Sequence, residues 1–139
     1  MPLPAMKDRR AYYFDKELEL RDGSAAAALD DTGASTGVEF AVRFFDVAKV
    51  VIDHGAITGT LNEDNNWTVN VQVSDVVGGT YTTIATTGLL GAAATQIEVP
   101  ISGLAAAVKD PDSAFIRVQA VKAGTPGDLS YGAYISPTP

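Results

Sequence analysis

Residues 67–74 alternate strictly between apolar and polar side chains. The apolar positions are Trp67, Val69, Val71 and Val73, and the polar positions are Thr68, Asn70, Gln72 and Ser74. Successive side chains of a strand point to opposite faces of its sheet, so this alternation predicts a strand with one face in a core. On a helix the same apolar side chains would scatter around the axis, which excludes a helix here. We expect this segment to be a central strand that organises the rest of the chain.

Shorter segments of the same kind recur along the chain, separated by turn-forming residues about every eight to twelve positions. The expected strands cover residues 15–21, 38–45, 49–53, 56–61, 67–74, 80–86, 95–101, 114–121 and 129–135. Many short alternating strands without a long amphipathic helix predict an all-β fold, an antiparallel β-sandwich or barrel, and one solvated face per strand favours two packed sheets. Residues 15–21 and Pro100 have the features of edge strands, namely alternating charges and a missing N–H donor.

Four further segments lie between the expected strands. Residues 24–37, rich in Ala, Asp, Thr, Gly and Ser, fit either a short helix capped by Ser24 or a loose strand followed by a loop. Residues 102–109 are the best candidate for a short helix, which Ser102 would cap. Residues 62–66 and 75–79 are rich in Asn, Asp and Gly and predict turns.

Residues 1–14 are expected to form an extended N-terminal arm, because Pro2 and Pro4 oppose both helix and central-strand pairing. The arm ends in a basic and aromatic cluster made of Arg9, Arg10, Tyr12, Tyr13 and Phe14. These side chains either pack back on the domain or dock on a partner, since Tyr and Arg dominate binding hot spots. The whole chain has 139 residues, about the length of one domain, so the remainder, 15–139, is expected to be a single β-sandwich domain.

The acidic composition narrows the classes of partner. The net charge is −7 and the isoelectric point is about 4.4, which disfavours a nucleic-acid binder because such proteins carry a basic face. The chain has no cysteine, so disulfides and thiolate metal sites are excluded. No apolar run reaches the length of a membrane span, and the first ten residues lack a signal-peptide core. We expect no membrane partner and synthesis in the cytoplasm.

No set of residues predicts catalysis. His54 is the only histidine, and its neighbour Asp53 would point to the opposite side of a strand, so a structural or surface role is favoured over a hydrolase site. Paired carboxylates from distant strands stay open, but nothing nominates Glu39, Glu63 or Glu98. We expect no enzyme activity and no cofactor.

Metal and sugar sites are also weakly supported. Residues 62–66 carry oxygen ligands of the kind that calcium prefers, but a hairpin turn explains them without an ion, so no metal is expected. Trp67 heads the central strand and is interpreted as a core anchor rather than a sugar platform. A carbohydrate- or receptor-binding module would require Trp67 to be exposed.

As a pattern, most of the chain resembles the small capsid cement or decoration proteins of tailed bacteriophages. The matching features are Glu-Leu-Glu-Leu at residues 17–20 after the arm, an Ala/Thr/Gly/Ser-rich stretch before Phe40, Val42 and Phe44, Val-Gln-Val-Ser-Asp at 71–75 before Gly-Thr-Tyr-Thr-Thr-Ile at 79–84, and Ile-Glu-Val-Pro-Ile-Ser-Gly-Leu at 97–104 before Phe-Ile-Arg-Val-Gln-Ala-Val at 115–121. The stretch before Val38 matches least.

This resemblance implies a non-enzymatic, jelly-roll-like sandwich. It implies a structural virion protein on the capsid exterior, binding the outer surface of a shell of major capsid protein and stabilising it as a homo-oligomer. The basic and aromatic cluster of the arm would then contact capsid protein or a neighbouring copy. A carbohydrate- or receptor-binding sandwich of a phage tail or fibre is the alternative, and a small hydrolase built on His54 is a more distant one.

Overall fold

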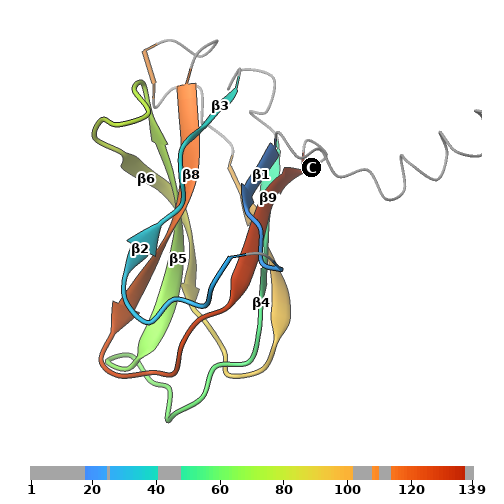
Figure 1. Cartoon of the computed structure of the whole chain (residues 1–139), viewed down its shortest axis with the longest axis vertical. Coiled ribbons are helices and arrows are strands. Elements are labelled where there is room, and N and C mark those ends of the chain that lie inside the picture. The colour runs from blue at the N-terminus through green and yellow to red at the C-terminus, as the bar shows by residue number, and fades with distance from the viewer. Residues whose placement is uncertain (1–17, 25, 41–47, 102–107, 110–113, 137–139) are drawn as a thin grey trace, which may run out of the picture.

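The chain folds into two antiparallel β-sheets packed face to face, as seen in the computed structural model (Figure 1). The structure describes residues 18–24, 26–40, 48–101, 108–109 and 114–136. No α-helix occurs in these ranges. The predicted all-β antiparallel sandwich is therefore confirmed.

The strands divide between a four-stranded and a five-stranded sheet. The four-stranded sheet has the order β1 (Glu19–Arg21), β9 (Tyr131–Ser136), β4 (Lys49–His54) and β7 (Thr95–Pro100). The five-stranded sheet has the order β2 (Gly33–Ala34), β8 (Ala114–Ala123), β5 (Asn66–Ser74) and β6 (Thr82–Leu89), and β3 (Val38–Phe40) pairs with β8 beyond β2. Each sheet thus joins strands from both ends of the chain.

The predicted central strand is confirmed as β5. It lies between β8 and β6 and pairs with β8 without interruption, from Asn66 opposite Ala123 to Ser74 opposite Phe115. Its four apolar side chains are all buried: Trp67, Val69, Val71 and Val73. The alternation of residues 67–74 exists because one face of this strand supplies the middle of the core.

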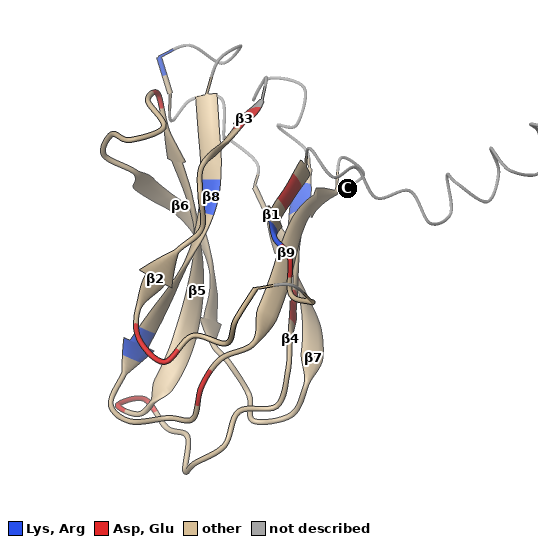
Figure 2. Ribbon diagram, in the orientation of Figure 1, with Lys and Arg blue, Asp and Glu red and all other residues tan. Residues whose placement is uncertain are grey.

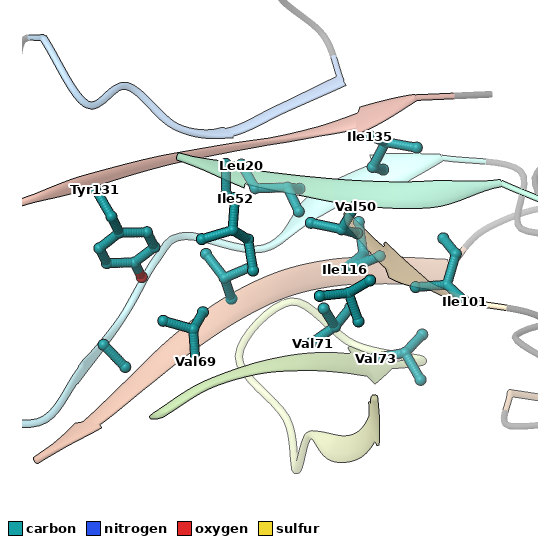
Figure 3. Packing of buried hydrophobic residues seen from close by; sticks show 14 of the residues in the cluster. Leu20, Val50, Ile52, Val69, Val71, Val73, Ile101, Ile116, Tyr131 and Ile135 are labelled. Atoms are coloured by element: carbon teal, nitrogen blue, oxygen red, sulfur yellow. The ribbon is translucent and has the colours of Figure 1, made fainter. Parts of the chain in front are cut away.

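The core fills the space between the sheets, as Figure 3 shows. Val69, Val71 and Ile116 project from the five-stranded sheet towards Val50 and Ile52 of the four-stranded sheet. In the four-stranded sheet, β4 and β9 place equivalent side chains opposite one another on the core face. Burying each aliphatic side chain of this size contributes roughly 1.5–3 kcal/mol to the free energy of unfolding, so packing across the two sheets is the main stabilising term.

The prediction of a strand at residues 56–61 is wrong, because this segment is a loop. Gly59 has a φ of 104°, a left-handed value that breaks an extended ladder. The backbone bonds of the segment go to other loops: the Ile57 N–H donates to the Ala92 carbonyl, and the Gly127 N–H donates to the Thr58 carbonyl. Ile57 is nevertheless buried in the core cluster, so its apolar side chain is explained by a loop that packs against the core rather than by a strand.

Other boundaries moved by smaller amounts. Residues 24–37, left open between helix and strand, contain the two-residue strand β2 and a bridge between Leu29 and Leu129. The strand expected at 38–45 is seen as β3, and residues 41–47 lie outside the described ranges. Residues 102–107 of the expected helix, and the arm at 1–14, lie outside them too.

The edge strands are kept from unwanted pairing by different means. β1 is short and charged, and β7 ends at Pro100, as expected for edges. β6 carries no charge (Figure 2), but two β-bulges interrupt its pairing with β5. At one bulge the Thr87 hydroxyl accepts the Val69 N–H at 3.1 Å in place of a backbone carbonyl. Bulges of this kind twist an edge away from a flat template.

Candidate functional site

The site residues predicted from the sequence, Arg9, Arg10, Tyr12, Tyr13 and Phe14, lie outside the described residues. The described chain begins at Leu18, a buried residue that leads into β1. What the structure locates is therefore the place where the arm joins the sandwich.

That place is one end of the sandwich, which we call the arm end. Lys49 of β4 pairs there with both Pro100 of β7 and Ser136 of β9, and in the other sheet Phe40 pairs with Ala114. Figure 1 shows these strand ends together at the same end of the molecule. The described residues that flank the undescribed stretches 1–17, 41–47, 102–107, 110–113 and 137–139 lie there.

The turn between β5 and β6 also lies at the arm end (Figure 1). It exposes two large apolar side chains, with Val76 60% exposed and Val77 48% exposed. Turns are normally built from Gly, Asn, Asp, Ser and Pro, because those residues satisfy or relax the backbone. The sequence predicted a turn at 75–79 correctly, but the pair of valines in it was not singled out.

The turn is held by a dense set of hydrogen bonds. The Val76 carbonyl accepts from the Gly79 N–H at 3.0 Å and from the Ser74 hydroxyl at 2.9 Å. The Tyr81 hydroxyl donates to the Val77 carbonyl at 2.9 Å, and the Lys109 N–H donates to the Asp75 carboxylate at 2.8 Å. The backbone beneath the two exposed side chains is therefore fixed.

A polar network on the outer face of the five-stranded sheet supports Tyr81. The Arg117 guanidinium lies 3.9 Å from the centre of the Tyr81 ring and donates through Nε to the Gln72 side chain at 2.8 Å. Gln72 in turn donates to Gln119 at 3.0 Å and to Thr83 at 3.1 Å. Partial burial raises the pKa of Tyr81, and the nearby Arg117 charge offsets part of the rise. Gln72 is buried because it lies at the centre of this network.

A hollow of about 500 Å³ opens on the outer face of the four-stranded sheet. Its lining includes the carboxylates of Glu19, Asp22 and Asp53 together with Tyr134 and Ser130. Register explains how these residues meet: Glu19 pairs with Tyr134, while Asp53 on the next strand pairs with Gly132. Within the described ranges no three acidic or histidine side chains are grouped closely enough to hold a metal ion.

His54 is buried rather than catalytic in appearance. It is 1% exposed, and its Nδ1 lies 2.7 Å from the Gly55 carbonyl oxygen. Its Nε2 has no hydrogen-bond partner among the described residues. Tyr131, directly opposite on β9, is likewise buried and its hydroxyl is likewise unpartnered there. A serine-type triad needs a base hydrogen-bonded to both nucleophile and orienting carboxylate, and among the described residues His54 makes neither contact.

The structure also places Trp67 and the Asn62–Asn65 turn, which the sequence raised as candidates for a sugar site and a metal site. Trp67 has no exposed surface, and its indole N–H donates to the Gly127 carbonyl at 2.8 Å. It is therefore a core anchor, and it does not offer a face to a sugar. The Asn62–Asn65 segment is a tight turn whose ends bridge each other, with Asn62 Oδ1 accepting the Asp64 N–H at 2.9 Å.

No protein-family model matches the chain, and no curated protein is significantly similar to it. Within the described part of the chain, no helix is both long enough and apolar enough to cross a membrane. Functional inference therefore depends on the sequence pattern and on the geometry above.

Proposed function

We propose that the chain is a structural virion protein, a capsid cement or decoration protein that binds the outer surface of a phage major capsid protein shell and stabilises it. The observation that carries this proposal is the pattern shared with such proteins, from Glu17–Leu20 through residues 71–84 to 115–121. The antiparallel sandwich is the fold that the resemblance implies, and the matched segments at 71–74, 82–84 and 115–121 are strands of its five-stranded sheet.

The strand order supports the jelly-roll part of the expectation. When β2 and β3 are counted as one interrupted edge strand, eight strands remain, in the orders β1-β9-β4-β7 and β2/β3-β8-β5-β6. Every connection between consecutive strands then crosses from one sheet to the other, except that between β5 and β6. A double-sheet arrangement of eight strands built from two Greek keys is the jelly roll. The proposal therefore includes a jelly-roll-like topology.

The arm is proposed to be the docking element. Arg9, Arg10, Tyr12, Tyr13 and Phe14 combine the side-chain types that dominate protein interfaces. Many copies on a symmetric lattice would hold the shell by avidity, even where each copy binds weakly. Such a protein would act on the virion exterior, as a homo-oligomer on the capsid, without a cofactor, nucleic acid or membrane.

Deleting residues 1–14 tests the proposal. The truncated chain should keep the β-sheet circular-dichroism spectrum and the thermal transition of the full chain, because the described core begins at Leu18. It should lose co-sedimentation with purified shells of the cognate capsid protein. Undiminished sedimentation of the truncated chain with shells would contradict the role of the arm, and failure of the full chain to sediment would contradict the function itself.

A carbohydrate- or receptor-binding module of a tail or fibre is the second candidate, and one observation favours it. The hollow beside Tyr134 offers carboxylates and an aromatic ring, the groups that usually contact sugar hydroxyls and ring faces. Trp67 takes no part, because it is buried. Glycan-array binding by the full chain, without shell binding, would favour this candidate over the first.

A further inference from the structure

We infer that the β5–β6 turn is a second docking element, in which Val76 and Val77 insert into an apolar pocket on a protein partner. This inference rests on the proposed function and names the contact that the folded domain makes with the shell, in addition to the arm. It begins from the exposure of both valines, at 60% and 48% of their surface. Solvent-facing turn positions favour polar residues and glycine, so an adjacent pair of exposed valines needs a reason other than folding.

The turn is organised before any partner arrives. The carbonyl groups of Val76 and Val77 are both engaged, the first by Gly79 and Ser74 and the second by the Tyr81 hydroxyl. Valine is also stiff at its first side-chain torsion, since two methyl groups crowd the Cβ atom. We call the exposed Val76 and Val77 side chains the tip of the turn. Little conformational entropy is then lost when the tip binds a partner, which is the usual advantage of a preorganised contact.

The support beneath the turn is specific. Tyr81 is fixed by the Arg117 guanidinium on its ring, and Gly37 lies so close to its hydroxyl that a methyl group at Gly37 would collide with it. Asp75 is tied to the backbone of Lys109 on the neighbouring connection. Three separate segments therefore hold this turn in place, although its exposed side chains contribute nothing to the core.

A second copy of the chain does not fit as the occupant. Two such tips meeting head to head would bury roughly a few hundred Å², well below the ~1,200 Å² of a stable interface. At an interface this small, the net charge of −7 further opposes pairing of two copies through this turn alone, and it opposes adsorption to anionic lipid. A concave protein surface with an apolar pocket and a neutral or basic rim satisfies both constraints.

The location of the turn supports a shared partner with the arm. The described chain begins at β1, which pairs with the C-terminal part of β9, and the β5–β6 turn lies at the same end of the molecule (Figure 1). Two weak contacts on one rigid body reinforce each other, because binding of the first raises the effective concentration of the second. The tip and the arm are therefore expected to engage one shell surface together.

A double substitution, V76S with V77S, tests the inference in the full chain. The probe is the purified shell of the cognate major capsid protein, and the readout is the apparent Kd from co-sedimentation. Removing both apolar side chains should weaken binding by about tenfold or more. L89S is the matched control, since Leu89 is 51% exposed at the end of β6 and pairs with Thr68, at the opposite end of β5 from the turn, and it should change the Kd less than about twofold.

The outcomes separate this inference from the proposed function. Wild-type chain that binds shells while the V76S/V77S variant binds equally well overturns the inference and leaves the proposed function standing. Equal weakening by L89S also overturns it, because the effect would then be general hydrophobicity. The wild-type chain could instead form a concentration-dependent dimer, or bind phosphatidylcholine vesicles, in a way that the V76S/V77S variant does not. Either result would assign the tip to another occupant and overturn the inference. Absence of wild-type binding overturns both proposals. An unchanged thermal transition in the variant verifies that folding is intact.

Discussion

Tyr131 has an environment that makes its ionisation a sensitive reporter of folding. Its side chain is 1% exposed, and its hydroxyl has no hydrogen-bond partner among the described residues. Burial raises the pKa of Tyr131 to about 12, and the Arg21 guanidinium, 4.4 Å from the ring centre, offsets part of that rise. A phenolate is poorly solvated at this depth, so the folded state retains the proton.

This pKa predicts a loss of stability at alkaline pH. An unfolded tyrosine loses its proton near pH 10, whereas folded Tyr131 loses it near pH 12. Between these values the unfolded state binds fewer protons, so the free energy of unfolding falls as the pH rises, by roughly 2–3 kcal/mol in total. Urea unfolding at a series of pH values from 8 to 12 measures the slope.

Tyr131→Phe is the matched control, because it keeps the ring and removes the titrating group. Its unfolding free energy should fall less steeply above pH 10 than that of the wild type, and at pH 7 it should be equal or slightly higher, since an unpartnered buried hydroxyl is removed. Identical alkaline slopes in the two proteins would show that Tyr131 is not the group responsible.

Individual residues differ in how far the sequence predicts their role. The burial of Val69, Val71 and Val73 follows directly from a period of two, and the structure confirms it. The burial of His54 Nε2 and of the Tyr131 hydroxyl without a hydrogen-bond partner in the described part of the chain has no such signal, because it depends on what each side chain meets across the sheets. The exposed Val76 does have a signal, namely a β-branched residue in a turn.

At the scale of elements, Gly124 directly follows β8 and packs closely against the Asn62–Asn65 turn. It has a φ of 73°, a left-handed value that favours glycine. A Cβ atom there would stand 2.5 Å from both the Asp64 carbonyl oxygen and the Asn65 side chain. The Asn65 side chain also accepts the Thr125 N–H, so the loop after β8 and the Asn62–Asn65 turn are held together at this point.

Gly124→Ala should therefore destabilise the fold by about 1–3 kcal/mol, through strained backbone and a collision that neighbouring backbone cannot relieve. Chemical denaturation measures the change. Gly91→Ala is the control, because an added Cβ atom at Gly91 meets nothing within 4 Å and its φ is not left-handed. Equal effects from the two substitutions would contradict the geometry at Gly124.

The elements that sequence alone predicts are those with long, regular alternation. β5 and β8 were located correctly because each presents one uninterrupted core face. The strand prediction at residues 56–61 failed for a physical reason. Ile57 is apolar because its loop packs against the core, and the segment forms no ladder of hydrogen bonds with a neighbouring strand. The hollow beside Tyr134 was unpredictable in the same way, since Glu19, Asp53 and Tyr134 are brought together only by strand register.

At the scale of the whole molecule, the sandwich closes through pairs of strands that are far apart in the chain. β1 pairs with β9, and β2 and β3 pair with β8. Folds dominated by such distant pairings must close large loops before the contacts that stabilise them can form, so they fold slowly. Refolding is expected in milliseconds to seconds.

Trp67 provides the measurement, because it is the only tryptophan and is completely buried. Stopped-flow refolding from urea should show a change in its fluorescence with a single main phase in that time range. The L89S variant, in which only an exposed side chain is altered, should refold at the same rate as the wild type. Microsecond refolding would contradict the dependence on distant pairing.

The function is the level that the sequence constrains least. Composition disfavoured nucleic-acid binding, but no motif in residues 18–136 identifies a partner, and the arm that was predicted to dock lies outside the described residues. A docking surface depends on shape complementarity with another molecule, which a single chain does not encode as a periodic pattern. The resemblance to capsid cement proteins therefore carries more of the proposal than any single side chain does.

The gathering of the strand ends has a practical consequence for labelling. β1, where the described chain begins, pairs with the C-terminal part of β9, and β9 ends at the arm end, whereas the Asn62–Asn65 turn lies at the opposite end (Figure 1). An epitope or fluorophore inserted in that turn would face away from a docked surface. Peptides grafted there, rather than fused at either terminus, would be displayed outward from any particle to which the chain is attached.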